Sequence, residues 1–197
     1  MNMELPIYML DISEDLQDDS EVSFVALVDK PAIRKNWNAI KDAQKFQIVS
    51  EDKHIISGCL MLADTPIYRR DETYGEYYVS FSKDTIVKIA QKFFKKGYQS
   101  NINLEHSPSM QVQGVTMFES FISDASRGIA PMKGFEDAPE GSWFGSMYVE
   151  NKKIWDEVKN GTFNGFSIEG IFNYKPKMTQ EEMMMAEIKK ILQSVQF

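Results

Sequence analysis

The chain has 197 residues, a formal net charge of −7 and 43% hydrophobic residues. This length fits one domain, and this hydrophobic content is enough for a core and argues against global disorder. The negative charge argues against non-specific nucleic-acid binding, which needs clustered Lys and Arg side chains. With Cys59 as its one cysteine, the chain forms no internal disulfide, and a reducing compartment fits. The N-terminus lacks the features of a secretory signal, and no run approaches the ~18 apolar residues of a membrane helix, so we expect a soluble intracellular protein.

Alternating and short apolar runs predict strands in the first part of the chain. Residues 32–45 are mixed in character and are expected to form a connecting arm. Cys59 is expected to be a small buried side chain within a strand, and residues 64–75 are expected to form a polar loop. The strands expected in this part are 5–12, 22–28, 46–49, 55–63 and 77–81.

Helical spacing of apolar residues predicts a helix that begins after Ser82 and ends before Gly97. A shorter helix is expected after Asn151, which suits an N-cap position. Thr179 and Glu182 form a capping box and predict a C-terminal helix that ends at about residue 196. Further strands are expected at 115–122, at 143–149 and around Ser167.

The segment GTFNGFSIEGIFNY, residues 161–174, places Ser167 in an apolar run with a period close to two. Ser167 and Glu169 should therefore share one face of a strand, opposite the aromatic side chains. By itself this pattern is typical of a core strand whose serine bonds a neighbour. It does not match the GxSxG elbow of the α/β-hydrolases, because Glu169 occupies the position of the second glycine.

Of the two histidines, His106 is better placed to act as a general base. His54 falls in an expected turn and is interpreted as an exposed bystander. His106 ends an apolar segment, and Ser107-Pro108 is expected to stop the strand there. Histidine titrates near neutral pH and can accept the proton of a serine, which is a poor nucleophile until a neighbour takes that proton.

A Ser–His pair also needs a group that orients the imidazole. Glu119, on the strand after His106, and Glu169, two residues beyond Ser167, are the candidates, and each also fits an ordinary strand carboxylate. Neither histidine has partners at the spacing of a zinc site, and neither GxxxxGK nor GxGxxG occurs. We therefore expect no metal and no cofactor.

Several motifs in chain order resemble those of one family. His106 precedes the Glu119 strand, which is followed by GSWFGSMYV at 141–149 and by IWDEVKNGTFNGFSIEG at 154–170. ELPIY, VDKPA and FQIV in the N-terminal part are similar to the same group. This order resembles the prohead (capsid-maturation) proteases of tailed bacteriophages, and especially the XkdF-type phage serine proteases. The resemblance covers nearly the whole chain to about residue 174.

The resemblance implies an α+β fold, namely a mainly antiparallel β-barrel flanked by helices, as in the herpesvirus assembly proteases (assemblins), with a C-terminal helix. It implies Ser167 as nucleophile and His106 as general base. Glu119 is preferred to Glu169 as the third member, because its strand resembles the family's Glu-Ser strand. The histidine that completes the herpesvirus triad has no counterpart after Ser167.

The resemblance also implies how the chain is divided and what it does. The expected segments are N-terminal strands and an arm over 1–45, a protease core over 46–176 and a C-terminal helix over 177–197. The expected function is a serine endopeptidase that cleaves scaffold and capsid-protein segments, and itself, during prohead maturation. It would work in the cytoplasm of the bacterial host, inside assembling proheads.

The expected partners are capsid and scaffold proteins as substrates, together with further copies of the chain in a homo-oligomer, but neither nucleic acid nor a membrane. One alternative is a catalytically inactive, protease-like protein that binds scaffold during capsid assembly. Another is a host-encoded regulatory domain that arose from a prophage gene.

Overall fold

The computed structural model describes residues 5–29, 45–72 and 75–177, which form three four-stranded sheets and two α-helices. The helices are α1 (Lys83–Lys95) and α2 (Lys152–Lys159), and two short 3-10 helices are η1 (Tyr98–Ser100) and η2 (Ala125–Arg127). The strands are β1 (Ile7–Asp11), β2 (Glu21–Val28), β3 (Gln47–Ser50), β4 (Ile55–Met61), β5 (Ile67–Asp71), β6 (Gly75–Phe81), β7 (Ile102–Leu104), β8 (Ser107–Val112), β9 (Val115–Ile122), β10 (Trp143–Val149), β11 (Gly165–Ile171) and β12 (Asn173–Pro176).

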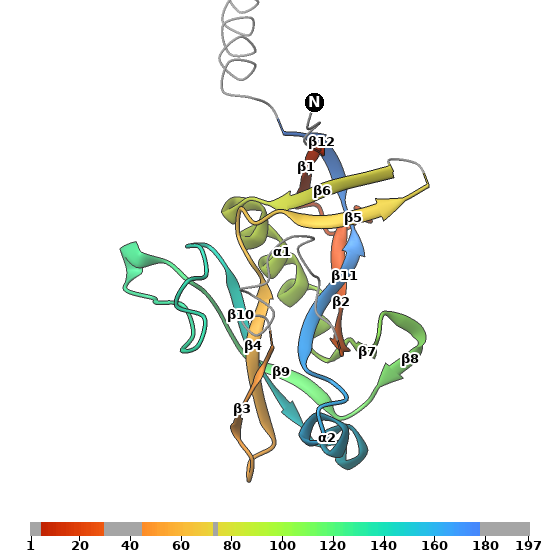
Figure 1. Cartoon of the computed structure of the whole chain (residues 1–197), viewed down its shortest axis with the longest axis vertical. Coiled ribbons are helices and arrows are strands. Elements are labelled where there is room, and N and C mark those ends of the chain that lie inside the picture. Colours follow the sequence, from red (N-terminus) through yellow and green to blue (C-terminus); the bar gives the residue numbers. More distant parts are fainter. Residues whose placement is uncertain (1–4, 30–44, 73–74, 178–197) are drawn as a thin grey trace, which may run out of the picture.

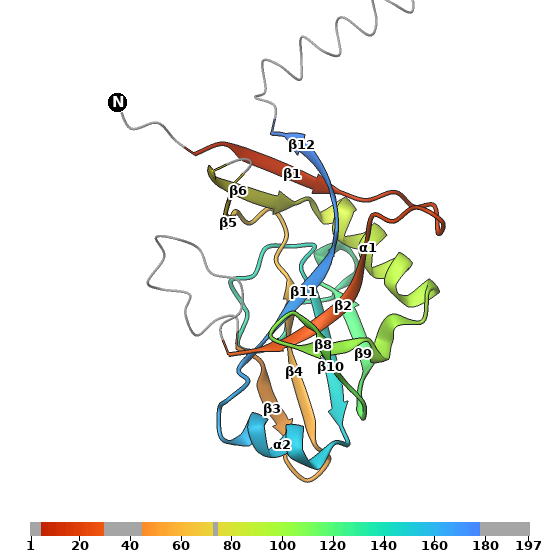
Figure 2. The same cartoon turned by 90° about the vertical axis from the view of Figure 1, so that its right-hand side faces the viewer.

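The three sheets have the strand orders β12-β1-β6-β5, β3-β4-β10-β9 and β11-β2-β7-β8. Figures 1 and 2 show the first sheet at one end of the molecule and α2 at the opposite end, with the other two sheets between them. Among the described strands, β1–β6 and β2–β7 pair in parallel and the remaining pairs are antiparallel. The expectation of a mainly β protein with flanking helices is therefore confirmed, but these pairings do not close the sheets into the expected barrel.

Two strands occur where the sequence predicted none. β5 lies within the expected loop 64–75, and β8 contains Pro108, which was expected to stop a strand. Both are edge strands. An edge strand can be exposed, so its residues need not alternate between apolar and polar. A proline in such a strand costs no hydrogen bond if its nitrogen points away from the neighbouring strand. Strand propensity and apolar periodicity therefore do not predict these two edge strands.

The predicted caps of both helices are confirmed. Ser82 Oγ accepts a hydrogen bond of 3.1 Å from the Thr85 N–H at the start of α1, and Gly97 follows the helix with a φ of 73°. Asn151 Oδ1 accepts from the first-turn N–H groups of α2. The buried face of α1 includes Phe93, whose ring meets Trp143 of β10 edge-on at 5.6 Å.

The N-terminal strands are hydrogen-bonded into sheets with strands from the predicted core. β1 lies between β12 and β6, and β2 lies between β11 and β7. The division of the chain at residues 45 and 176 stays a prediction. The connecting arm, apart from Lys45, and the C-terminal helix lie outside the described residues. Neither described helix has the length and apolar character of a membrane span.

Lys92 of α1 joins the helix to the segment between β1 and β2. Its buried ammonium group donates to the carbonyl oxygens of Ser13, Asp18 and Ser20 at 3.1, 2.9 and 2.9 Å.

We expect Lys92→Met to lower the free energy of unfolding by about 3 kcal/mol, because three carbonyl groups lose a charged donor. Chemical denaturation would measure this change. Lys95→Met, on the exposed side of the same helix, is the control, and an equal effect of both substitutions would contradict this role.

Candidate active site

Strand β11 presents Ser167 to the face of its sheet that also carries Asn103. Ser167 pairs with Ala26 of β2, and Ala26 pairs with Asn103 of β7. Directly paired residues point to the same face, so these three side chains form a row across the sheet. Ala26 lies between the two polar residues in this row.

His106 reaches Ser167 from a tight turn. β7 and β8 are joined by Glu105 and His106, whose φ angles are 50° and 57°, and Leu104 pairs directly with Ser107. Positive φ at both central residues is the mark of a type I′ hairpin turn, which normally contains Asn-Gly. For Glu and His this backbone costs about 1 kcal/mol or more at each residue.

Nearby contacts hold this strained turn in place. The Asp29 N–H donates to Glu105 Oε1 at 2.6 Å, and the Glu105 N–H donates to the Leu27 carbonyl at 3.1 Å. Backbone strain that the surrounding structure maintains is concentrated at functional sites. Here the turn brings the imidazole of His106 to the β11 side of the sheet.

The structure brings Ser167, His106 and Glu169 together. His106 Nε2 lies 2.9 Å from Ser167 Oγ, and His106 Nδ1 lies 3.5 Å from Glu169 Oε2. The first distance is within hydrogen-bond reach, whereas the second is a charge contact slightly longer than a hydrogen bond. A carboxylate beside Nδ1 favours the tautomer with hydrogen on that nitrogen, which leaves Nε2 free to accept the serine proton. The prediction that Ser167 and Glu169 share a face is confirmed.

Asn103 completes the cluster, and the sequence analysis did not identify it. Its side chain is only 1% exposed, and Nδ2 donates to Glu169 Oε2 at 2.8 Å. This bond fixes the Glu169 carboxylate next to the imidazole. Among the described residues, Asn103 Oδ1 has no hydrogen-bond partner although it is buried. The sequence feature that could have identified Asn103 is its polar amide between two apolar residues of a buried strand, three positions before His106.

Glu119, the third member preferred from the resemblance, has a different partner. It lies on β9 in another sheet and accepts a 2.6 Å hydrogen bond from Ser146 Oγ, which in turn accepts one of 2.8 Å from Ser57. In the described part of the chain, no hydrogen bond or ion pair joins Glu119 to His106. This geometry reverses the order of preference: Glu169 is the carboxylate beside the imidazole. The catalytic roles themselves stay predictions.

His54 and Cys59, the other residues considered from the sequence, both pack within the fold. His54 is half-buried and not an exposed bystander: its Nδ1 lies 3.1 Å from the Val149 carbonyl oxygen, and its ring stacks on Trp155 at 4.6 Å. Cys59 is a buried strand residue, as predicted, and burial raises the pKa of its thiol to about 12. No three His, Cys, Asp or Glu side chains gather as a metal site within residues 5–29, 45–72 and 75–177.

The raised pKa of Cys59 should protect its thiol from alkylation. At pH 8 a thiol with a pKa of about 12 is a thiolate only about 10⁻⁴ of the time, whereas an unfolded cysteine titrates near ~8.5. We therefore expect iodoacetamide to react at least ~10³-fold more slowly with the folded protein than with the chain in denaturant. Mass spectrometry of timed samples measures both rates. Equal alkylation rates in the folded and unfolded states would contradict this protection. Because the Cys59 thiol of the unfolded chain ionises at a lower pH than that of the folded protein, the free energy of unfolding should also fall as the pH rises above ~9.

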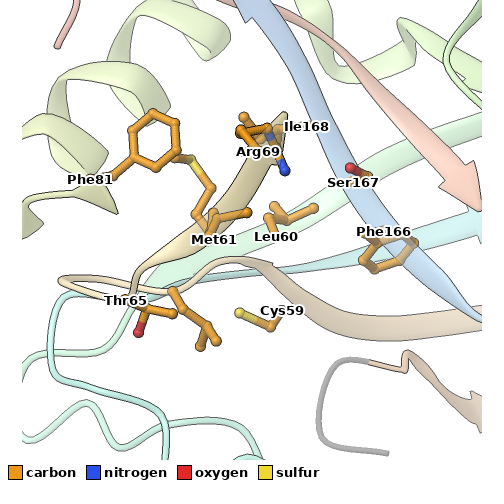
Figure 3. A pocket seen from close by; sticks show the side chains of 11 residues that line it. Cys59, Leu60, Met61, Thr65, Arg69, Phe81, Phe166, Ser167 and Ile168 are labelled. Carbon is orange, nitrogen blue, oxygen red and sulfur yellow. The ribbon is translucent and has the colours of Figure 1, made fainter. Parts of the chain in front are cut away.

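A cavity of about 60 Å³ lies beside Ser167. Apolar side chains from β4, from Phe81 of β6 and from Phe166 and Ile168 of β11 form much of its wall, and Arg69 of β5 also lines it (Figure 3). A hydroxyl with a base at hydrogen-bond distance, next to an apolar cavity, can attack a carbonyl carbon whose neighbouring side chain occupies that cavity.

Comparison with known proteins gives one match. A family model with the description "Putative phage serine protease XkdF" matches residues 42–175. The matched range contains Ser167, His106, Glu169 and Asn103. No curated protein and no solved structure matches the chain.

Proposed function

Because this chain belongs to that family of phage serine proteases, we propose that it is an endopeptidase whose nucleophile is Ser167 and whose general base is His106. The observation that carries the proposal is the 2.9 Å distance between His106 Nε2 and Ser167 Oγ. The Glu169 carboxylate at the other ring nitrogen supports it, since an imidazole that accepts a proton is stabilised by a nearby anion.

In the proposed reaction, Ser167 Oγ attacks the carbonyl carbon of the scissile bond as its proton passes to His106 Nε2. The imidazolium then protonates the leaving amine, the C–N bond breaks, and an acyl group stays on Ser167. A water molecule then gives a proton to His106 and attacks the acyl carbon. The bond between that carbon and Ser167 Oγ breaks, the imidazolium returns its proton to Oγ, and the carboxylic acid is released. Glu169 stabilises the imidazolium in both halves, and Asn103 keeps that carboxylate in position.

The substrates in this proposal are scaffold and capsid-protein segments, and the chain itself, during prohead maturation inside the bacterial host. Membership of a phage serine protease family supports the phage setting of this proposal. The proposal includes the expected likeness to the herpesvirus assembly proteases, which place a Ser–His pair on strands of a β-barrel.

The proposal is tested by co-expressing the protein with the capsid and scaffold proteins of its phage. We expect shortened capsid or scaffold products with the wild-type chain and full-length proteins with Ser167→Ala. Gel electrophoresis and intact-mass measurements distinguish the two. Processing that is unchanged in the Ser167→Ala co-expression would contradict the proposed function.

A further inference from the structure

Arg69 is the one cationic side chain in the described wall of the cavity beside Ser167. It lies on β5, opposite Tyr77 of β6. In the view of Figure 3 its side chain overlaps that of Ile168 and lies above Leu60, and all three residues line the cavity together with Ser167. The remaining wall is largely apolar, so the guanidinium is the feature that can distinguish one substrate side chain from another.

The guanidinium has no anionic partner among the described residues. Its one hydrogen bond there runs from Nη1 to the carbonyl of Tyr68 at 3.1 Å, and none of the ion pairs found includes it. Asp71, two residues further along β5, accepts a hydrogen bond from Tyr77. An arginine carries five N–H donors, so most of the Arg69 donors remain available.

Arg69 is an exposed residue of β5, so its charge is partly hydrated, although desolvation by the surrounding protein lowers the pKa of its guanidinium. Coulombic interactions with the Tyr174 and Tyr77 side chains offset only part of this lowering of the Arg69 pKa. A carboxylate that entered the cavity would give the guanidinium an anionic partner and could accept two parallel N–H bonds.

We propose that the cavity is the specificity pocket for a glutamate whose carbonyl group Ser167 attacks, and that Arg69 binds the carboxylate of that glutamate. A glutamate side chain offers two methylene groups to the apolar walls and a carboxylate to Arg69. This inference rests on the proposed function, since it names the residue on the acyl side of the scissile bond. Arg69 is a specificity-determining residue in this account and has no part in the proton transfers.

The test uses three probes of the form acetyl-Ala-Ala-X diphenyl phosphonate, in which X carries the side chain of Glu, Gln or Leu. Ser167 Oγ attacks phosphorus, phenoxide leaves, and the serine proton passes to His106. We expect the Glu probe to label the wild-type protein about 10- to 100-fold faster than the isosteric but neutral Gln probe. Arg69→Met should remove this difference and leave the labelling rate of the Gln probe within about threefold of wild type.

Arg70→Met is the matched control, because Arg70 is the next residue of β5, is exposed and does not line the cavity. It should retain the preference for Glu over Gln. Equal rates for the Glu and Gln probes in the wild-type protein, or a preference that survives Arg69→Met, would overturn the assignment of the pocket.

Peptide binding separates failure of this inference from failure of the proposed function. NMR titration of Ser167→Ala with acetyl-Ala-Ala-Glu amide and with its Gln counterpart requires no catalysis. We expect the Glu peptide to bind more tightly, and only when Arg69 is present. If this preference is found while no phosphonate labels the wild type, Arg69 binds the glutamate side chain as proposed, but the proposed chemistry at Ser167 is wrong. If the two peptides bind equally or not at all, the pocket assignment is wrong.

Discussion

Replacing Ser167 by alanine is expected to lower the rate of peptide-bond hydrolysis on the order of 10⁶-fold. The hydroxyl oxygen is the atom that forms the acyl-enzyme, and it lies within hydrogen-bond distance of His106 Nε2. The substitution removes one oxygen atom from a strand residue that is 9% exposed, so the fold should tolerate it. Initial rates on a peptide from a processed capsid or scaffold segment, with thermal unfolding measured in parallel, test this expectation.

Ser146→Ala is the matched control for this substitution. Ser146 is also a buried strand serine and it donates to a carboxylate, Glu119, but among the described residues no histidine forms a hydrogen bond with it. It should keep nearly full activity. The double variant Ser167→Ala/His106→Ala should be no slower than either single variant, because the two side chains act as a unit. Additive losses would show that His106 acts apart from Ser167.

Replacing Glu169 by glutamine is expected to lower kcat on the order of 10⁴-fold and to leave the fold intact. The amide has the shape of the carboxylate but no charge, so it does not stabilise the imidazolium. Its NH₂ group can also hold His106 in the tautomer with hydrogen on Nε2, which cannot accept the Ser167 proton. Steady-state kinetics with the same capsid or scaffold peptide measures the loss.

Glu119→Gln is the comparison that decides between the two carboxylates. Glu119 accepts a hydrogen bond from Ser146 in a separate sheet, so we expect a change of less than about threefold, as for an ordinary surface substitution. A large loss in Glu119→Gln together with normal activity in Glu169→Gln would contradict the geometry and restore the preference drawn from the resemblance.

The sequence predicted the serine strand well because its alternation has a direct physical cause. One face of β11 packs into the core, while Ser167 and Glu169 face the site. Helix ends were equally predictable at Ser82 and Asn151, since a cap depends on a side chain and a backbone N–H only a few residues apart.

The partner of His106 was not predictable by the same means. Local patterns do not report contacts between strands, so the residues alone left Glu119 and Glu169 open. The decisive facts are the Ala26 pairing, which places Ser167 and Asn103 in one row, and the left-handed turn at Glu105 and His106. Nothing in the residue types Glu-His signals such a turn, because surrounding contacts impose it against their preference.

The most direct test of the Ser–His assignment is covalent labelling of assembled particles with a fluorophosphonate, followed by peptide mapping. The predicted result is a phosphonyl adduct on Ser167 in the wild-type protein, with no adduct on Ser146 and none on Ser167 in His106→Ala. Particles in which Ser167 stays unlabelled would contradict the account and favour a non-catalytic assembly protein.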